Sequence, residues 1–213
     1  MTSMNTALFD QAWDRFESWL ADRSPADHAA LQPPATAAEI AGLEEQLGFA
    51  LHPELRRLLE RRNGVVAPET GDGAGQEFFP AGGILPLGHR LSSTAEIASV
   101  HKILVVVGED NAEADAWDEE EPAGHLHLCV PFALPNDGGV AFVDHRPGPT
   151  YGHVYEMGIG SGDLDGTLWG AGLAEFVGAV TDALEAGAPF LYYWPDTFEA
   201  PSGRTCVTWE VRA

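Results

Sequence analysis

Apolar residues recur at helical spacing near the start of the chain. Phe9, Trp13, Phe16, Trp19 and Leu20 fall on one side of a helix, with charged residues between them. This pattern predicts an amphipathic helix, because positions three and four residues apart share one helix face. A proline-containing linker follows it. We expect residues 1–30 to form this helix and linker, ahead of a domain that spans residues 31–213.

Two further helices are predicted between residues 36 and 64. Thr36 and Glu39 have the spacing of a capping box, in which each side chain satisfies a free backbone N–H at the start of a helix. Gly48 follows the apolar stripe of this helix, where a left-handed residue commonly ends a helix. Pro53 suits the first position of the next helix, because its missing N–H would have no helical partner there.

From residue 65 the apolar stretches become short and alternate with Gly and Pro turns. Ser93 and Glu96 form a second capping box for a short helix that ends near residue 100, and residues 173–186 predict a long amphipathic helix. Residues 136–139 (NDGG) predict the turn of a hairpin. The predicted strands are 78–80, 83–87, 103–107, 125–132, 140–144, 152–157, 191–194 and 205–211. The order predicts an α+β fold, a single domain with a central, largely antiparallel sheet flanked by N-terminal and C-terminal helices.

Composition agrees with a globular domain. The chain has 213 residues, 45% of them hydrophobic, and includes six Trp, which is enough to form a core. No apolar run has the length of a bilayer span, and the N-terminus lacks the basic and apolar regions of a signal peptide. We therefore expect a cytoplasmic protein in which Cys129 and Cys206 are reduced thiols, with a disulfide between them as the alternative.

Charge is distributed unevenly. Residues 65–213 contain five basic residues and 23 acidic ones, and residues 109–121 hold eight acids among thirteen residues. Such a surface repels phosphates and anionic lipids and attracts basic proteins, so neither nucleic acid nor a membrane is an expected partner. The alternative is that the acidity serves only solubility.

Three residues with metal-binding side chains alternate at 125–129. On a strand His125, His127 and Cys129 would share one face, and zinc accepts both imidazole and thiolate. Strand geometry places the first and third about 14 Å apart, so only the two His could share an ion, without a defined third ligand. Asp163-Leu164-Asp165-Gly166 is typical of the start of a calcium loop, but the pattern lacks the Glu required at its twelfth position, and a turn is favoured. We expect no metal and no cofactor.

The chain shows no clear catalytic constellation. It has no Ser in a strand–turn–helix elbow. Asp144-His145 could hold a hydrogen-bonded base, but no nucleophile is recognisable beside it, and capping of the turn at Pro147-Gly148-Pro149 is favoured. We therefore expect that the protein is not an enzyme. A metal-assisted enzyme centred on His125, His127 or Asp144 is the alternative.

Trp117 lies within the acidic run, where no periodicity predicts its burial. An aromatic ring among carboxylates has the composition of an interface anchor for a basic partner. The alternative is that the ring packs into the core and fixes the loop.

The order of these segments resembles the SUKH superfamily, the domain of the fungal cell-wall assembly regulator and of many bacterial immunity proteins. Residues 34–59 (PATAAEIAGLEEQLGFALHPELRRLL), ending in Asn63-Gly64, look like its opening helix pair. Residues 131–133 (PFA), 137–139 (DGG) and 142–144 (FVD) look like its central hairpin. Residues 152–154 (GHV) and 174–177 (AEFV) fit its end. The core resemblance spans 31–187, followed by a strand extension at 188–213. The acidic stretch at 109–121 is longer than the family pattern.

The resemblance implies binding rather than catalysis. Bacterial members are similar to immunity proteins that neutralise polymorphic or contact-dependent toxins, often nucleases, whose toxin domains are basic. We therefore expect an immunity protein, monomeric or weakly homodimeric, that binds a basic toxin domain. A regulatory protein-interaction module without a toxin is the alternative. The expected partner-binding residues are Glu109, Asp110, Asp115, Trp117, Asp118, Glu119, Glu120 and Glu121.

Overall fold

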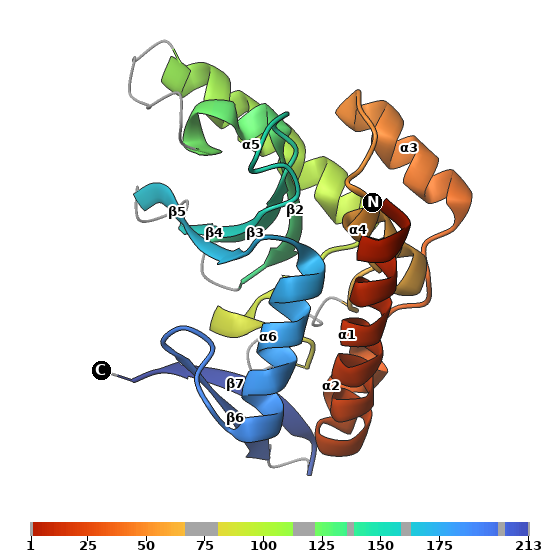
Figure 1. The fold of residues 1–213 in the computed structure, drawn as a ribbon, viewed down its shortest axis with the longest axis vertical. Helices are drawn as coiled ribbons and strands as arrows, with labels where there is room; N and C mark the ends of the chain where they lie inside the picture. Colours follow the sequence, from red (N-terminus) through yellow and green to blue (C-terminus); the bar gives the residue numbers. More distant parts are fainter. Residues whose placement is uncertain are drawn as a thin grey trace, which may run out of the picture.

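The structure is a computed structural model that describes residues 2–66, 81–112, 122–135, 139–158, 163–199 and 203–212. It confirms the α+β class, with helices at the start of the chain, a sheet in the middle and a helix and hairpin at the end (Figure 1). The α-helices are α1 (Thr2–Arg23), α2 (Pro25–Ala30), α3 (Ala37–Leu47), α4 (Pro53–Arg61), α5 (Thr94–Ala112) and α6 (Leu173–Ala186).

Every strand pair among the described residues is antiparallel, in line with the predicted largely antiparallel sheet. The five-stranded sheet has the order β1-β2-β3-β4-β5, and β6 and β7 form a separate hairpin. The strands are β1 (Arg90–Leu91), β2 (Cys129–Leu134), β3 (Val140–Asp144), β4 (Val154–Gly158), β5 (Asp163–Gly170), β6 (Tyr193–Glu199) and β7 (Thr205–Val211). Two short 3₁₀ segments, η1 (Pro86–Gly88) and η2 (Pro122–Leu128), precede β1 and β2.

Both faces of the sheet are covered. Along β3, Ala141 and Val143 point into the large core with the N-terminal helices and α6, whereas Val140 and Phe142 point into a smaller core with α5 and η2. Side chains alternate between the two faces of a strand, so a strand buried on both sides is apolar throughout. This explains the uninterrupted apolar stretch of residues 140–143.

The predicted helix starts are confirmed. The Thr36 hydroxyl accepts the Glu39 N–H at 3.2 Å, and the Glu39 carboxylate accepts the Thr36 N–H at 2.7 Å. Gly48 ends α3 with φ 82°, a left-handed conformation that glycine adopts without a steric cost. Pro53 opens α4. The linker prediction was wrong at Pro25, where the short helix α2 begins.

Helix α1 is part of the main core. Its residues Phe9, Trp13, Phe16 and Leu20 are fully or almost fully buried, and α1 lies alongside α6 (Figure 1). Burying one such side chain contributes about 1.5–3 kcal/mol. The start of the chain and its last helix are therefore held together mainly by apolar packing.

Residues 103–107 form helix rather than the predicted strand. The Ser93–Glu96 capping box is present, with the Ser93 N–H 2.7 Å from the Glu96 carboxylate, but the helix it opens continues to residue 112. Ile97 and Leu104 are buried at helical spacing, while Ile103 is exposed. The packing of this helical stripe against η2 and β2 outweighs the β-propensity of the branched residues.

Three other local predictions need correction. Residues 125–128 belong to η2, and the strand begins only at Cys129. Residues 83–87 hold an isolated bridge at Leu85 and part of η1 rather than a strand. The predicted turn at 163–166 is the start of β5. The predicted strand at 78–80 and most of the turn at 136–139 lie outside the described residues.

None of the described helices combines the length and the apolar composition that crossing a bilayer requires.

Candidate partner-binding site

The acidic segment at 109–121 begins on the last turn of α5. Glu109 is exposed there, and Asp110 is in the same helix. The other predicted partner-binding residues lie outside the described residues: Asp115, Trp117, Asp118, Glu119, Glu120 and Glu121.

The helix that leads into this segment exposes apolar side chains. Ile103 and Val106 are 57% and 55% exposed, and they are one turn apart on the same face of α5. Glu109, three residues after Val106, is also exposed and neighbours it one turn further along. Aliphatic side chains next to carboxylates combine the apolar contact and the charge that a protein-binding surface uses.

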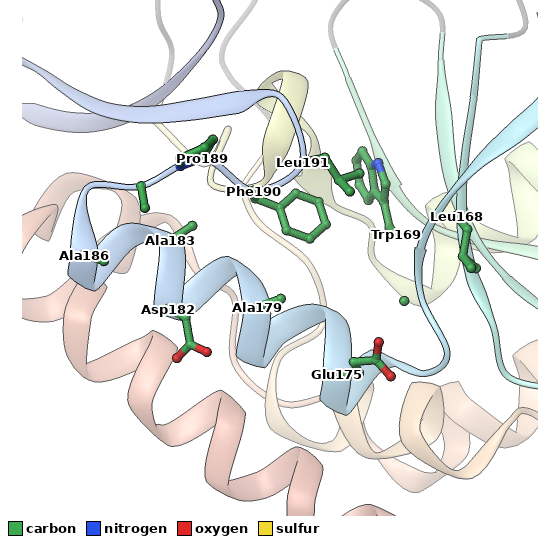
Figure 2. A pocket seen from close by; sticks show the side chains of 12 residues that line it. Leu168, Trp169, Glu175, Ala179, Asp182, Ala183, Ala186, Pro189, Phe190 and Leu191 are labelled. Carbon is green, nitrogen blue, oxygen red and sulfur yellow. The ribbon is translucent and has the colours of Figure 1, made fainter.

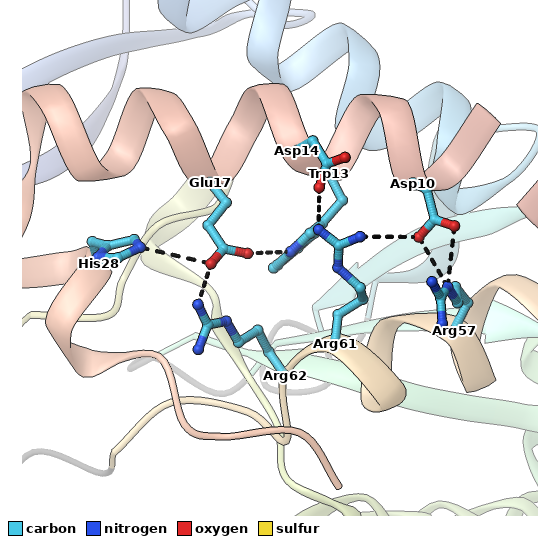
Figure 3. Close-up of polar contacts among 8 residues, drawn as sticks. All are labelled: Asp10, Trp13, Asp14, Glu17, His28, Arg57, Arg61 and Arg62. Carbon is cyan, nitrogen blue, oxygen red and sulfur yellow. Dashed lines mark hydrogen bonds and ion pairs between the residues drawn. The ribbon is translucent and has the colours of Figure 1, made fainter. Parts of the chain in front are cut away.

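Each Arg among the first 64 residues forms an ion pair with a carboxylate of the same chain. Arg57 and Arg61 on α4 contact Asp10 on α1 at 2.9 and 3.2 Å (Figure 3). The Arg62 guanidinium contacts Glu17, whose other oxygen accepts the Trp13 indole N–H at 2.7 Å. The remaining arginine pairs are Arg15 with Asp182 and Glu185, Arg23 with Asp22, Arg56 with Glu44, Arg57 with Glu60, and Arg61 with Asp14.

These ion pairs contribute little to stability individually, because most of their side chains remain in contact with water. Their main effect is on charge. Arginines that already face carboxylates do not neutralise the acids elsewhere on the surface. The formal net charge of −22 is the same whether or not these pairs form, so the pairing decides only where the unpaired carboxylates lie.

The candidate metal ligands His125, His127 and Cys129 do not form a metal site. His125 and His127 lie in η2, with ring centroids 6.2 Å apart, and Cys129 is buried at the start of β2. Burial raises the pKa of the Cys129 thiol strongly, which keeps it protonated and a poor ligand. Among the described residues no group of three His, Cys, Asp or Glu could hold a metal ion. Cys129 and Cys206 are free thiols, as predicted.

Asp144 has a structural role. Its buried carboxylate pairs with the Arg146 guanidinium at 2.8 Å and accepts the Arg146 backbone N–H at 2.8 Å. The predicted capping of the following turn is therefore confirmed for Asp144. The neighbouring imidazole of His145 turns towards the start of α4 instead.

His145 belongs to a cluster of buried imidazoles, with His52 and His101, that sequence reasoning missed. Its Nε2 accepts the backbone N–H of His52 at 2.8 Å, and its Nδ1 donates to the Val143 carbonyl at 2.9 Å. Burial, together with the nearby imidazoles of His52 and His101, lowers the pKa of His145 to about 4. Both nitrogens serve the fold and the ring stays neutral, so His145 is not poised as a base near neutral pH.

A groove lies between α6, the end of β5 and residues 188–191 (Figure 2). Its volume is about 590 Å³. Trp169 forms part of its wall and stacks on Phe176, with ring centroids 5.1 Å apart. Glu175 and Asp182, both on α6, lie along one side. The sequence analysis did not single out Trp169, because nothing local connects it to the segment after α6.

One family model matches this chain. It is that of the SMI1/KNR4 family (SUKH-1), and it covers residues 34–177, from the turn before α3 into the first half of α6. The comparison with curated proteins finds no match. Helices α1 and α2 and the β6–β7 hairpin lie outside the matched residues. Because the match spans more than half of the chain, this protein belongs to the SMI1/KNR4 family (SUKH-1).

Proposed function

We propose that the protein is a non-catalytic immunity protein that binds and neutralises a basic toxin domain of the nuclease type. The family is generally non-catalytic, and its superfamily includes immunity proteins. The observation that carries the proposal is the charge of the chain. It has 33 acidic and 11 basic residues, and the arginines of the N-terminal third already contact carboxylates of the chain. A nuclease domain is basic where it holds nucleic acid, so an acidic inhibitor complements it.

The proposed contact surface combines the exposed face of α5 with the acidic segment that follows it. Ile103 and Val106 would supply apolar contact, Glu109 and the acids of 110–121 would attract the partner, and Trp117 would anchor it. Attraction between opposite charges speeds association and is weakened by salt. We therefore expect fast, salt-sensitive binding.

The identity of the partner tests the function directly. The full chain, expressed in its native host, would be captured together with bound proteins, and the captured protein would be expressed with and without it. Capture of a basic, toxic protein whose toxicity is suppressed by co-expression supports the proposal. Capture of a neutral or acidic host protein without any rescue contradicts it and favours a regulatory interaction module.

A matched pair of variants tests the site. Asp118→Asn with Glu119→Gln removes two charges from the acidic segment, and Glu45→Gln with Glu199→Gln removes two exposed charges elsewhere. The first pair should slow association with the identified toxin about tenfold at low salt and reduce its salt dependence, since rim charges act mainly on the association rate. The second pair should change the rate less than about twofold. Equal effects of both pairs would exclude this site.

A further inference from the structure

The groove beside α6 exposes apolar surface that the fold does not cover. Leu168 on β5 is 48% exposed and Leu191 is 51% exposed, and both line the groove with Trp169 between them and Phe190 beside Leu191 (Figure 2). Trp169 and Phe190 are themselves buried, with ring centroids 6.2 Å apart and nearly perpendicular planes. One wall of the groove therefore consists of packed aromatic rings, and two aliphatic side chains lie at its open edge.

Leu191 is held in a conformation that leucine disfavours. It sits at the tip of a tight turn in which Phe190 and Tyr193 exchange backbone hydrogen bonds of 2.9 Å, and its φ is 53°. A positive φ at the first tip residue of such a turn is normally supplied by glycine. The turn thus places a half-exposed leucine over the groove at a position where glycine would fit the backbone better. Strain of this kind is found mainly at binding and catalytic sites.

The charged side chains that line the groove have one sign. Glu175 and Asp182 line it, and none of its described lining residues is Lys or Arg. Asp182 already binds the Arg15 guanidinium at 2.8 Å, whereas the Glu175 carboxylate is exposed. The contact with Arg15 also shows that the carboxylates of α6 accept a guanidinium from another segment packed beside the helix. An apolar residue followed by a cationic one would match both properties of the groove.

We infer that this groove is a binding site for an extended, basic peptide segment of a protein partner. An apolar side chain of the segment packs between Leu191 and Trp169, and a neighbouring Lys or Arg pairs with Glu175. The site lies on β5, α6 and residues 188–191, whereas the proposed toxin-binding surface is on α5. The two proposals rest on different residues, so either can fail without the other.

The test uses the ¹⁵N-labelled full chain and two blocked tetrapeptides. The basic probe is acetyl-Leu-Arg-Leu-Lys-amide, and the charge-reversed control is acetyl-Leu-Glu-Leu-Glu-amide. The basic peptide should shift the amide signals of Gly170 and Leu191 and the indole signal of Trp169 in a saturable way. The acidic peptide should leave them in place, because Glu175 repels it and the net charge of the chain opposes it.

Two variants separate binding from folding. Leu191→Gly should weaken binding of the basic peptide about fivefold, because half of a leucine side chain no longer covers the ligand. It should not lower the thermal midpoint, since glycine relieves the positive φ. Glu175→Gln should weaken binding of the basic peptide about threefold, as expected for the loss of an exposed charge pair. The matched controls are Leu8→Ala, which removes a leucine 54% exposed on α1, and Glu45→Gln on α3; both should bind as the parent does.

Three results would overturn the inference. One is that neither peptide shifts the groove signals. Another is that both peptides shift them equally, which would exclude a charge-selective site. The third is that Leu191→Gly unfolds at a lower temperature and binds unchanged, which would make Leu191 a structural residue of the turn.

Discussion

His145 should make the protein less stable as the pH falls from 6.5 towards 4. Its imidazole is buried against Phe49 and Tyr151, with ring centroids 5.4 and 6.0 Å away. Burial lowers the pKa of His145 to about 4 from the ordinary 6.5, and the imidazoles of His52 and His101 act in the same direction. Protonation would also place an N–H of the ring against the backbone N–H of His52, whose hydrogen bond would be lost.

The size of the effect follows from proton linkage. The unfolded chain takes up the proton near pH 6.5, while the folded chain resists it until about pH 4. The contribution of His145 is therefore complete above pH 6.5 and is lost as the pH decreases. The loss amounts to about 2 kcal/mol at about pH 5 and approaches about 3 kcal/mol below the folded pKa. Burial also lowers the pKa of His52 and of His101, which adds to the loss.

Urea unfolding of three proteins between about pH 7.5 and about pH 5 measures this loss. In His145→Gln the side-chain oxygen can still accept a hydrogen bond, but the side chain cannot titrate. This variant should start from a lower free energy of unfolding and lose about 2 kcal/mol less on acidification than the parent. His127→Gln removes an exposed imidazole and should follow the parent. The carboxylates are the same in all three proteins, so their titration cancels in the comparison.

The reasoning would be refuted by parallel pH profiles. If the parent and His145→Gln lose the same free energy of unfolding between the two pH values, burial of this imidazole is not the source of acid sensitivity.

Four further outcomes are expected. Gly152→Ala should lower the free energy of unfolding by about 2 kcal/mol or more, because φ is 92° and a Cβ would lie 2.5 Å from Nε2 of His52. Gly178→Ala should raise it by about 0.5–1 kcal/mol, because a Cβ there meets nothing within 4 Å in α6; similar urea midpoints for the two variants would contradict the packing. Cys129 should resist a thiol reagent in the folded protein and react after unfolding, because burial raises the pKa of its thiol; rapid labelling of the native protein would contradict this. Ser93→Ala should cost about 1 kcal/mol through loss of the cap of α5, and an unchanged thermal midpoint would speak against that role.

Local signals predicted the helix starts correctly. The Thr36–Glu39 capping box and the left-handed Gly48 act within a few residues of themselves, so their effect is visible without the rest of the chain. Because these signals act only locally, they do not predict how far α5 continues. Residues 103–107 are as apolar and branched as a strand, and a short apolar run has no period that separates the two structures. Only the burial of Leu104 and the exposure of Ile103 settle that this segment is helix.

The candidate sites show the same division. The excess of acids and their concentration at 109–121 are sums over the sequence, so the sign of the charge could be predicted from it. The groove could not, because Trp169 and Leu191 come from segments that meet only when β5 and the turn after α6 pack against the same helix. The His145 cluster is similar, since its hydrogen bond to His52 joins residues 93 positions apart.

The sequence by itself determined the helix caps, the hairpin at the centre of the sheet, the family and the sign of the surface charge. The tertiary structure alone decided which charges remain for a partner. Arg15 and Asp182 lie 167 positions apart, and their contact exists only because α1 and α6 bury their apolar faces together. Caps and net charge depend on neighbouring residues or on simple sums, whereas pairing and burial depend on which distant segments the core brings together.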